Sequence, residues 1–103
     1  MIIVLAEMSY APAALDDVRA LCAGVEDFCR GFDGCESFVL TFAGSRPGTI
    51  VSVEVWRDAV SLRGHAAVAR SAPELSAWHA LVGDMRASIF SASPIELGAL
   101  GGG

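Results

Sequence analysis

Residues 49–86 read TIVSVEVWRDAVSLRGHAAVARSAPELSAWHALVGDMR, and the hydrophobic pattern changes within this stretch. As far as Trp56, valines alternate with Ser52, Glu54 and Trp56, and this alternation is typical of a β-strand with two different faces. From Ala59 onward the apolar residues recur at three- and four-residue spacing. This spacing predicts one helix from about Ala59 to Ala69 and a second that starts near Pro73, with an apolar stripe that reaches Ile89.

The remaining segments complete a small mixed fold. We expect strands at residues 2–9, 35–43 and 49–57, a helix at residues 13–31, and a last strand at about 88–97 that contains Pro94. The order β-α-β-β-α-α-β is that of the ferredoxin-like α+β fold, a four-stranded antiparallel sheet with helices on one face. The length of 103 residues predicts one domain, residues 1–97, and a flexible glycine-rich tail, residues 98–103.

One face of the predicted sheet has no helix to cover it. Val51, Val53 and Val55 lie opposite Ser52, Glu54 and Trp56 because side chains alternate along a strand. The composition is 53% hydrophobic and only 18% charged, which is apolar for a small domain. These features predict that a second copy of the chain covers the apolar face.

Charge and cysteine usage exclude several partners. The formal net charge is −5, and the basic residues are scattered rather than clustered, so we expect no nucleic-acid partner: they are Arg19, Arg30, Arg46, Arg57, Arg63, Arg70 and Arg86. The apolar run Met1–Ala6 is too short to span a bilayer, and we expect a cytoplasmic protein with no membrane partner. The three cysteines match no metal-ligand spacing and are expected as buried thiols.

Glu54, Trp56, Asp58, Leu62 and His65 stand in the order E-x-W-x-D-x-x-x-L-x-x-H. This order resembles the antibiotic-biosynthesis-monooxygenase (ABM) family. The resemblance implies a homodimeric α+β barrel that oxidises a reduced aromatic, such as a quinol, an anthrone or a polyketide phenol, with dioxygen and without metal or flavin. Related domains include members with no assigned activity, so a non-catalytic ligand-binding or accessory domain is the alternative.

Trp56 shares its strand face with Ser52 and Glu54 and ends its strand, which places it near the space between sheet and helices. It is either a large core side chain or a wall that stacks on a flat aromatic substrate. The resemblance favours the wall. The family enzymes carry an asparagine four residues before this tryptophan, where this chain has Ser52, and a serine cannot reproduce the paired donor and acceptor of a carboxamide.

His65 and His79 lie at the boundary of the apolar face of their predicted helices. Each is either a half-buried hydrogen-bonding residue or the base that accepts a phenolic proton. We therefore take Trp56, His65 and His79 as candidate catalytic residues. Arg86 is expected on the same helix edge as His79, where it would pair with a substrate carboxylate or with an exposed acid. The candidate substrate-binding residues are Ser52, Glu54, Phe38, Phe42, Trp78, Met85 and Arg86.

Haem degradation is a further alternative. Related haem-degrading enzymes bind iron through a histidine on the helix that carries His79, but they add an asparagine where this chain has Met8 and a tryptophan where it has His65. The chain has no G-x-S-x-G, H-E-x-x-H, phosphate-binding or dinucleotide motif. We therefore expect no metal site and no cofactor.

Overall fold

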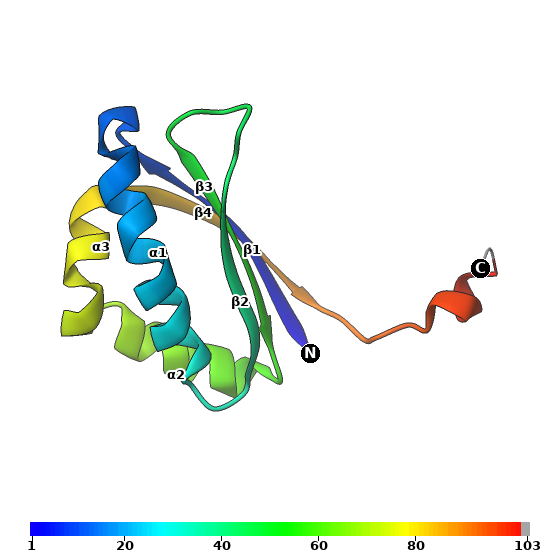
Figure 1. The fold of residues 1–103 in the computed structure, drawn as a ribbon. Coiled ribbons are helices and arrows are strands. Elements are labelled where there is room, and N and C mark those ends of the chain that lie inside the picture. The colour runs from blue at the N-terminus through cyan, green and yellow to red at the C-terminus, as the bar shows by residue number, and fades with distance from the viewer. Residues whose placement is uncertain (102–103) are drawn as a thin grey trace.

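The computed structural model describes residues 1–101 and confirms the ferredoxin-like α+β fold. Four antiparallel strands form one sheet in the order β2-β3-β1-β4. Figure 1 shows the three α-helices on one face of this sheet. The strands and α-helices are β1 (Ile2–Tyr10), α1 (Leu15–Arg30), β2 (Cys35–Phe42), β3 (Thr49–Trp56), α2 (Ala59–Ala69), α3 (Ser76–Leu81) and β4 (Val82–Ser91). Short 3-10 helices are η1 (Pro12–Ala14), η2 (Pro73–Leu75) and η3 (Leu97–Leu100).

The core lies between the sheet and the helices. Alternate residues of β3 are buried there, and Ser52, Glu54 and Trp56 share this face as the alternation predicts. Val18, Val25 and Cys29 face them from α1. The core therefore contains buried polar groups on β3 together with its apolar packing.

The other side of the sheet, which we call the open face, carries no helix of residues 1–101 (Figure 1). It carries apolar side chains that are more than a third exposed, namely Leu5, Val39, Val53 and Phe90. At one end of this face Glu7 pairs with Arg46 at 2.6 Å and with Arg86 at 3.6 Å. The open face is thus an apolar surface bordered by a cluster of charges.

The predicted third helix is wrong after Leu81, and the predicted last strand begins too late. The segment from Val82 to Ser91 is β4, which pairs along β1, and Pro94 lies beyond the strand. Backbone pairing with β1 prevails over the helical spacing of the apolar residues, and Gly83 at the junction weakens a helix. A β-bulge lies opposite Met8, where Ser9 pairs with Gly83 but Glu7 pairs with Arg86, so that Asp84 and Met85 together face one residue.

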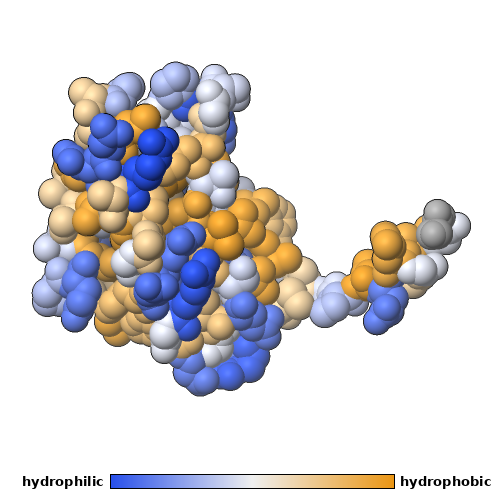
Figure 2. Space-filling model, viewed as in Figure 1, coloured by the Kyte–Doolittle hydropathy of each residue, from blue (hydrophilic) through white to orange (hydrophobic). Residues whose placement is uncertain are grey.

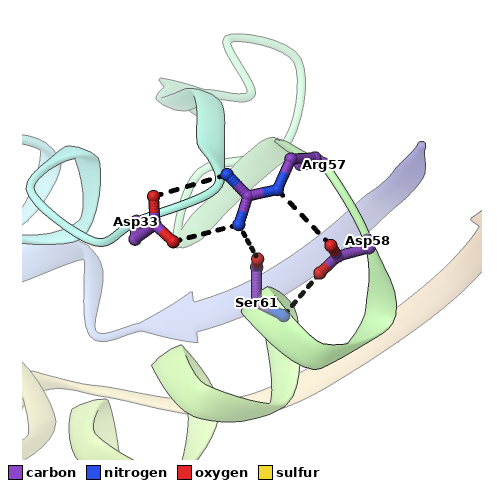
Figure 3. A network of polar contacts seen from close by, with 4 residues as sticks. All are labelled: Asp33, Arg57, Asp58 and Ser61. Carbon is purple, nitrogen blue, oxygen red and sulfur yellow. Dashed lines mark hydrogen bonds and ion pairs between the residues drawn. The ribbon is translucent and has the colours of Figure 1, made fainter.

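A polar network fixes the start of α2 (Figure 3). Asp58 caps the helix, because its Oδ1 accepts a hydrogen bond from the backbone N–H of Ser61 at 2.8 Å. Arg57 bridges Asp58 to Asp33, which lies in the loop before β2. Gly34 follows with φ +85°, and its carbonyl accepts a hydrogen bond from the backbone N–H of Arg57. These contacts join the two ends of the β2–β3 hairpin to α2.

The chain after β4 leaves the body as an extended arm that ends in η3 (Figure 1). Figure 2 shows apolar surface on this arm, where Ile95, Leu97 and Leu100 are exposed. Residues 102 and 103 of the predicted glycine-rich tail lie outside the described residues. No helix within residues 1–101 has the length and apolar character needed to cross a bilayer.

Candidate functional site

A cavity of about 310 Å³ lies between the sheet and the helices. Residues from all four strands, all three α-helices and η2 line it. Its apolar walls are Met8, Val25, Phe38, Leu40, Leu75, Trp78, Val82 and Met85. Its polar groups are Cys29, Ser52, Glu54, His65, His79 and Asp84. Mostly apolar walls with a few polar groups are typical of a small-molecule site.

Glu54 is the buried acid of this cavity, with 9% of its surface exposed. Its Oε1 accepts a hydrogen bond from the indole N–H of Trp56 at 2.9 Å, since residues two apart on a strand share a face. Burial raises the pKa of the Glu54 carboxyl above its ordinary value, and the bond from Trp56 partly opposes this rise. One carboxylate oxygen is thus held by the protein at the base of the cavity.

His65 lies in an aromatic environment on α2. Its ring packs on Trp56 with 4.7 Å between centroids and meets Phe32 edge-on at 5.0 Å. Its Nε2 lies 3.2 Å from the Sγ of Cys29. Burial lowers the pKa of His65 and raises the pKa of the Cys29 thiol to about 12. The pair is therefore a neutral imidazole beside a neutral thiol at neutral pH.

His79 and Asp84 line the exposed side of the cavity. The Nε2–H of His79 donates a hydrogen bond to the carbonyl of Ala69 at 2.9 Å, which joins α3 to the end of α2. Asp84 lies in the bulge with φ 49°, and its Oδ2 accepts a hydrogen bond from the Ser9 hydroxyl at 3.1 Å. His79 comes from α3 and Asp84 from β4, two elements that follow one another directly in the sequence.

The structure places most of the sequence-predicted site residues in the lining, but three lie elsewhere. Trp56 is fully buried behind Glu54 and His65 and does not form a wall of the cavity. Phe42 packs edge-on against Tyr10, and Arg86 lies on β4 at the open face rather than on a helix beside His79. The predicted positions that do line the cavity are Phe38, Ser52, Glu54, His65, Trp78, His79 and Met85.

Several lining residues were not among the predicted ones. Leu40 could have been found from strand alternation, because it lies two residues after Phe38 on the same face. Asp84 was missed because the sequence pattern assigned it to a helix, whereas a bulge in β4 brings it to the cavity. No sequence signal marks that bulge apart from the adjacent Gly83.

Comparison with protein families gives one match, with a family model described as antibiotic biosynthesis monooxygenase, over residues 1–81. These residues include every element up to α3 and all cavity-lining residues except those of β4. No curated protein matches the chain.

Several solved structures share the fold. A proposed antibiotic biosynthesis monooxygenase from Deinococcus radiodurans has a TM-score of 0.79 at 22% identity, over 93% of this chain and 96% of that one. A proposed member from Nitrosomonas europaea has a TM-score of 0.76 at 11% identity, over 89% and 98%. SnoaB, a cofactor-independent oxygenase from Streptomyces nogalater, has a TM-score of 0.67 at 22% identity, over 91% and 94%.

Proposed function

Since the chain belongs to the antibiotic biosynthesis monooxygenase family, we propose that it is a monooxygenase that works without metal or flavin on a reduced aromatic: a quinol, an anthrone or a polyketide phenol. The observation that carries this proposal is the cavity of about 310 Å³. Phe38 and Trp78 supply aromatic surface for a flat ring, and Ser52 and Glu54 supply polar contacts at its base. The likeness to SnoaB in fold supports the same class of reaction.

The reaction requires little chemistry from the protein. For an anthrone, the ring CH₂ group and one dioxygen give a ketone and one water, and the substrate supplies the electrons. Removing a proton first makes an electron-rich anion, which reacts with dioxygen more readily. The protein therefore has to position the ring and accept a proton. His65 and His79 both line the cavity and are candidates for that acceptor.

The proposed enzyme is a cytoplasmic homodimer. The open face supports this proposal, because Leu5, Val39, Val53 and Phe90 are exposed together on a sheet surface without helices. A second copy packed there would bury them and leave the helical side, with the cavity, turned outward.

Ser52 favours a second candidate, a dimeric ligand-binding domain without turnover. It is 2% exposed and lies in the cavity lining, where the family resemblance implies a carboxamide. A hydroxyl donates and accepts through one oxygen atom, whereas a carboxamide offers a separate donor and acceptor that are fixed in one plane.

A panel of quinols and anthrones, incubated with and without dioxygen, tests both candidates. We expect oxygen-dependent formation of quinone or ketone by the parent protein. Ser52→Asn restores the carboxamide and should raise the rate, whereas Ser37→Asn, which makes the same change on the open face of β2, should not. Tight binding with no oxygen consumption by the parent or by Ser52→Asn would favour the ligand-binding domain.

Haem degradation is the remaining alternative function. The Nε2–H of His79 already donates to Ala69, and Met8 and His65 occupy the positions where haem degraders carry asparagine and tryptophan. We therefore expect weak or absent binding when hemin is titrated into the protein. A tight one-to-one complex whose Soret band disappears in His79→Ala would overturn this ranking.

A further inference from the structure

Apart from two histidines, the ionisable oxygen and nitrogen groups of the cavity lining are all acidic. Among residues 1–101 the lining includes the carboxyl groups of Glu54 and Asp84 but no lysine or arginine. Arg86 lies two residues after Asp84 in the sequence, but it pairs with Glu7 on the opposite face of the sheet. Arg30 donates to the carbonyl of Phe38 and pairs with Glu26 outside the lining. An anionic ligand would thus meet two carboxyl groups and no lysine or arginine in the lining.

Glu54 is the polar group best placed to bind a ligand hydroxyl. Trp56 holds one of its carboxylate oxygens, and the residue also lines the cavity. The neighbouring histidines are less available: Nε2 of His65 lies against Cys29, and Nε2 of His79 is bonded to a backbone carbonyl. An ionised carboxylate can accept several hydrogen bonds, so the bond from Trp56 leaves acceptor capacity for a ligand.

We propose that Glu54 accepts the hydroxyl hydrogen of an uncharged hydroxyaromatic ligand, and that Glu54 and Asp84 exclude aromatic carboxylates from the same cavity. In a turnover cycle the O–H proton moves to the Glu54 carboxylate, and the electron pair of that bond stays on the ligand oxygen. The charge of the site is unchanged, because the carboxylate becomes neutral as the phenol becomes an anion. The class of ligand rests on the proposed function, but the role of Glu54 can be tested by binding alone.

The environment of Glu54 makes it a stronger base than an exposed carboxylate. Burial raises its pKa, which brings it closer to that of a phenol. The titratable groups that face it are Cys29 on α1, Cys35 on β2 and His65 on α2, with His79 and Asp84 across the cavity. The raised pKa of each of these two thiols keeps it uncharged, so neither adds a competing charge at neutral pH.

The test uses three matched ligands without dioxygen: 2-naphthol, 2-methoxynaphthalene and 2-naphthoate, measured by equilibrium dialysis. We expect the naphthol to bind at least tenfold more tightly than its methyl ether, because a hydrogen bond to a charged group is worth about that factor or more. The naphthoate should bind most weakly. The naphthol preference should grow as pH rises through the pKa of Glu54, because the ionised carboxylate accepts a stronger hydrogen bond than the neutral acid does.

Glu54→Gln should reduce the preference for naphthol over the ether to about threefold or less and should weaken the exclusion of naphthoate. Asp84→Asn should keep the hydroxyl preference and weaken only the exclusion. Glu36→Gln removes one exposed carboxylate outside the cavity and should change neither. Naphthoate binding as tight as naphthol binding, or no hydroxyl preference in the parent at any pH, would overturn the proposal even if Glu54→Gln failed to fold.

Turnover is measured separately. If the parent oxidises a substrate, Glu54→Gln should lower kcat by about a hundredfold or more, the usual contribution of a general base. A parent that selects naphthol through Glu54 but oxidises nothing would contradict the monooxygenase proposal and leave this one intact. A Glu54→Gln variant that oxidises as fast as the parent would show that Glu54 is not the proton acceptor.

Discussion

Glu54 lies beneath the helices, where the charged form of a carboxyl group is unfavourable. Its pKa in the folded protein is above the ordinary value, so the folded state binds this proton more tightly than the unfolded chain does. The contribution of Glu54 to stability is therefore most favourable below the ordinary carboxyl pKa. It is lost as pH rises through the raised value in the folded protein.

We predict that Glu54→Gln makes the protein more stable than the parent at pH 7 to 8, with the difference disappearing below about pH 4. Glutamine keeps an oxygen for the Trp56 indole and carries no charge to bury. Thermal unfolding of both proteins across this pH range measures the effect. A variant that is less stable than the parent at pH 8 would show that ionised Glu54 stabilises the fold.

The two tryptophans should respond differently to a ligand. Trp78 lines the cavity, whereas Trp56 is fully buried behind Glu54 and His65. Quenching of fluorescence by a planar quinone should therefore be lost mainly in Trp78→Phe and largely kept in Trp56→Phe. Titration of the two variants measures this difference. Quenching that depends on Trp56 alone would restore the sequence-based prediction that Trp56 is a substrate wall.

At the level of residues, strand alternation was enough to predict that Ser52, Glu54 and Phe38 lie on the face of the sheet that the helices cover. It could not tell whether Trp56 forms a wall or the layer behind one. That distinction depends on His65, whose ring packs across the indole from another element. A contact between α2 and β3 leaves no mark in the sequence of either segment.

At the scale of elements, α2 is joined to the rest of the fold at its first turn by the network of Arg57, Asp58 and Ser61 (Figure 3). Gly34 lies against this network with φ +85°, and a Cβ added there would meet the Ser61 side chain. The helix that carries His65 is thus positioned by a turn that only glycine fits well.

We predict that Gly34→Ala destabilises the protein by about 1–3 kcal/mol, because alanine is strained at positive φ and displaces Ser61. Gly24→Ala is the matched control, since Gly24 lies inside α1 with no atom within 4 Å of an added Cβ. This second change should stabilise by about 0.5–1 kcal/mol. Chemical denaturation measures the free energy of unfolding of both variants. Equal changes in the two would contradict the role given to Gly34.

The helices and strands up to Ala69 follow their sequence patterns closely, because each has a clear period and a marked end. Beyond Leu81 the pattern fails. Val82, Met85 and Ile89 have the spacing of a helix, yet they lie in a strand that satisfies its backbone by pairing with β1. The partner strand lies more than 70 residues earlier in the chain, so no local window contains the deciding contact.

At the scale of the whole molecule, the apolar open face is the surface where we propose that a second copy of the chain packs. Val53 lies near its middle on β3 and is 37% exposed, and the neighbouring strands β1 and β2 carry Leu5 and Val39. An interface of standard size, about 1,200 Å² of total buried area or more, is expected for a stable dimer.

We predict that Val53→Asp converts a dimer into monomers or prevents folding, because it places an unpaired charge in that interface. Val60→Asp is the control: Val60 is 70% exposed on α2, on the other side of the sheet, and its substitution should leave the dimer intact. Sedimentation velocity at micromolar concentration measures both. A stable monomer of the parent protein would disprove the proposed assembly.

The bulge opposite Met8 determines which side chains of β4 point to each face of the sheet. It inserts one extra residue between Gly83 and Arg86, so that Arg86 lies on the same side of the sheet as Glu7, and Phe90 on the same side as Ile3. A register of β4 that lost the bulge without losing a residue would reverse every side chain from Arg86 to Ser91, and Phe90 would leave the open face. Deleting one residue from 83–85 would instead restore regular pairing, keep Phe90 opposite Ile3, and remove only the paired place of Asp84 and Met85 beside the cavity. The cavity and the open face lie on opposite sides of the sheet, yet one extra residue in β4 determines which of its side chains each receives.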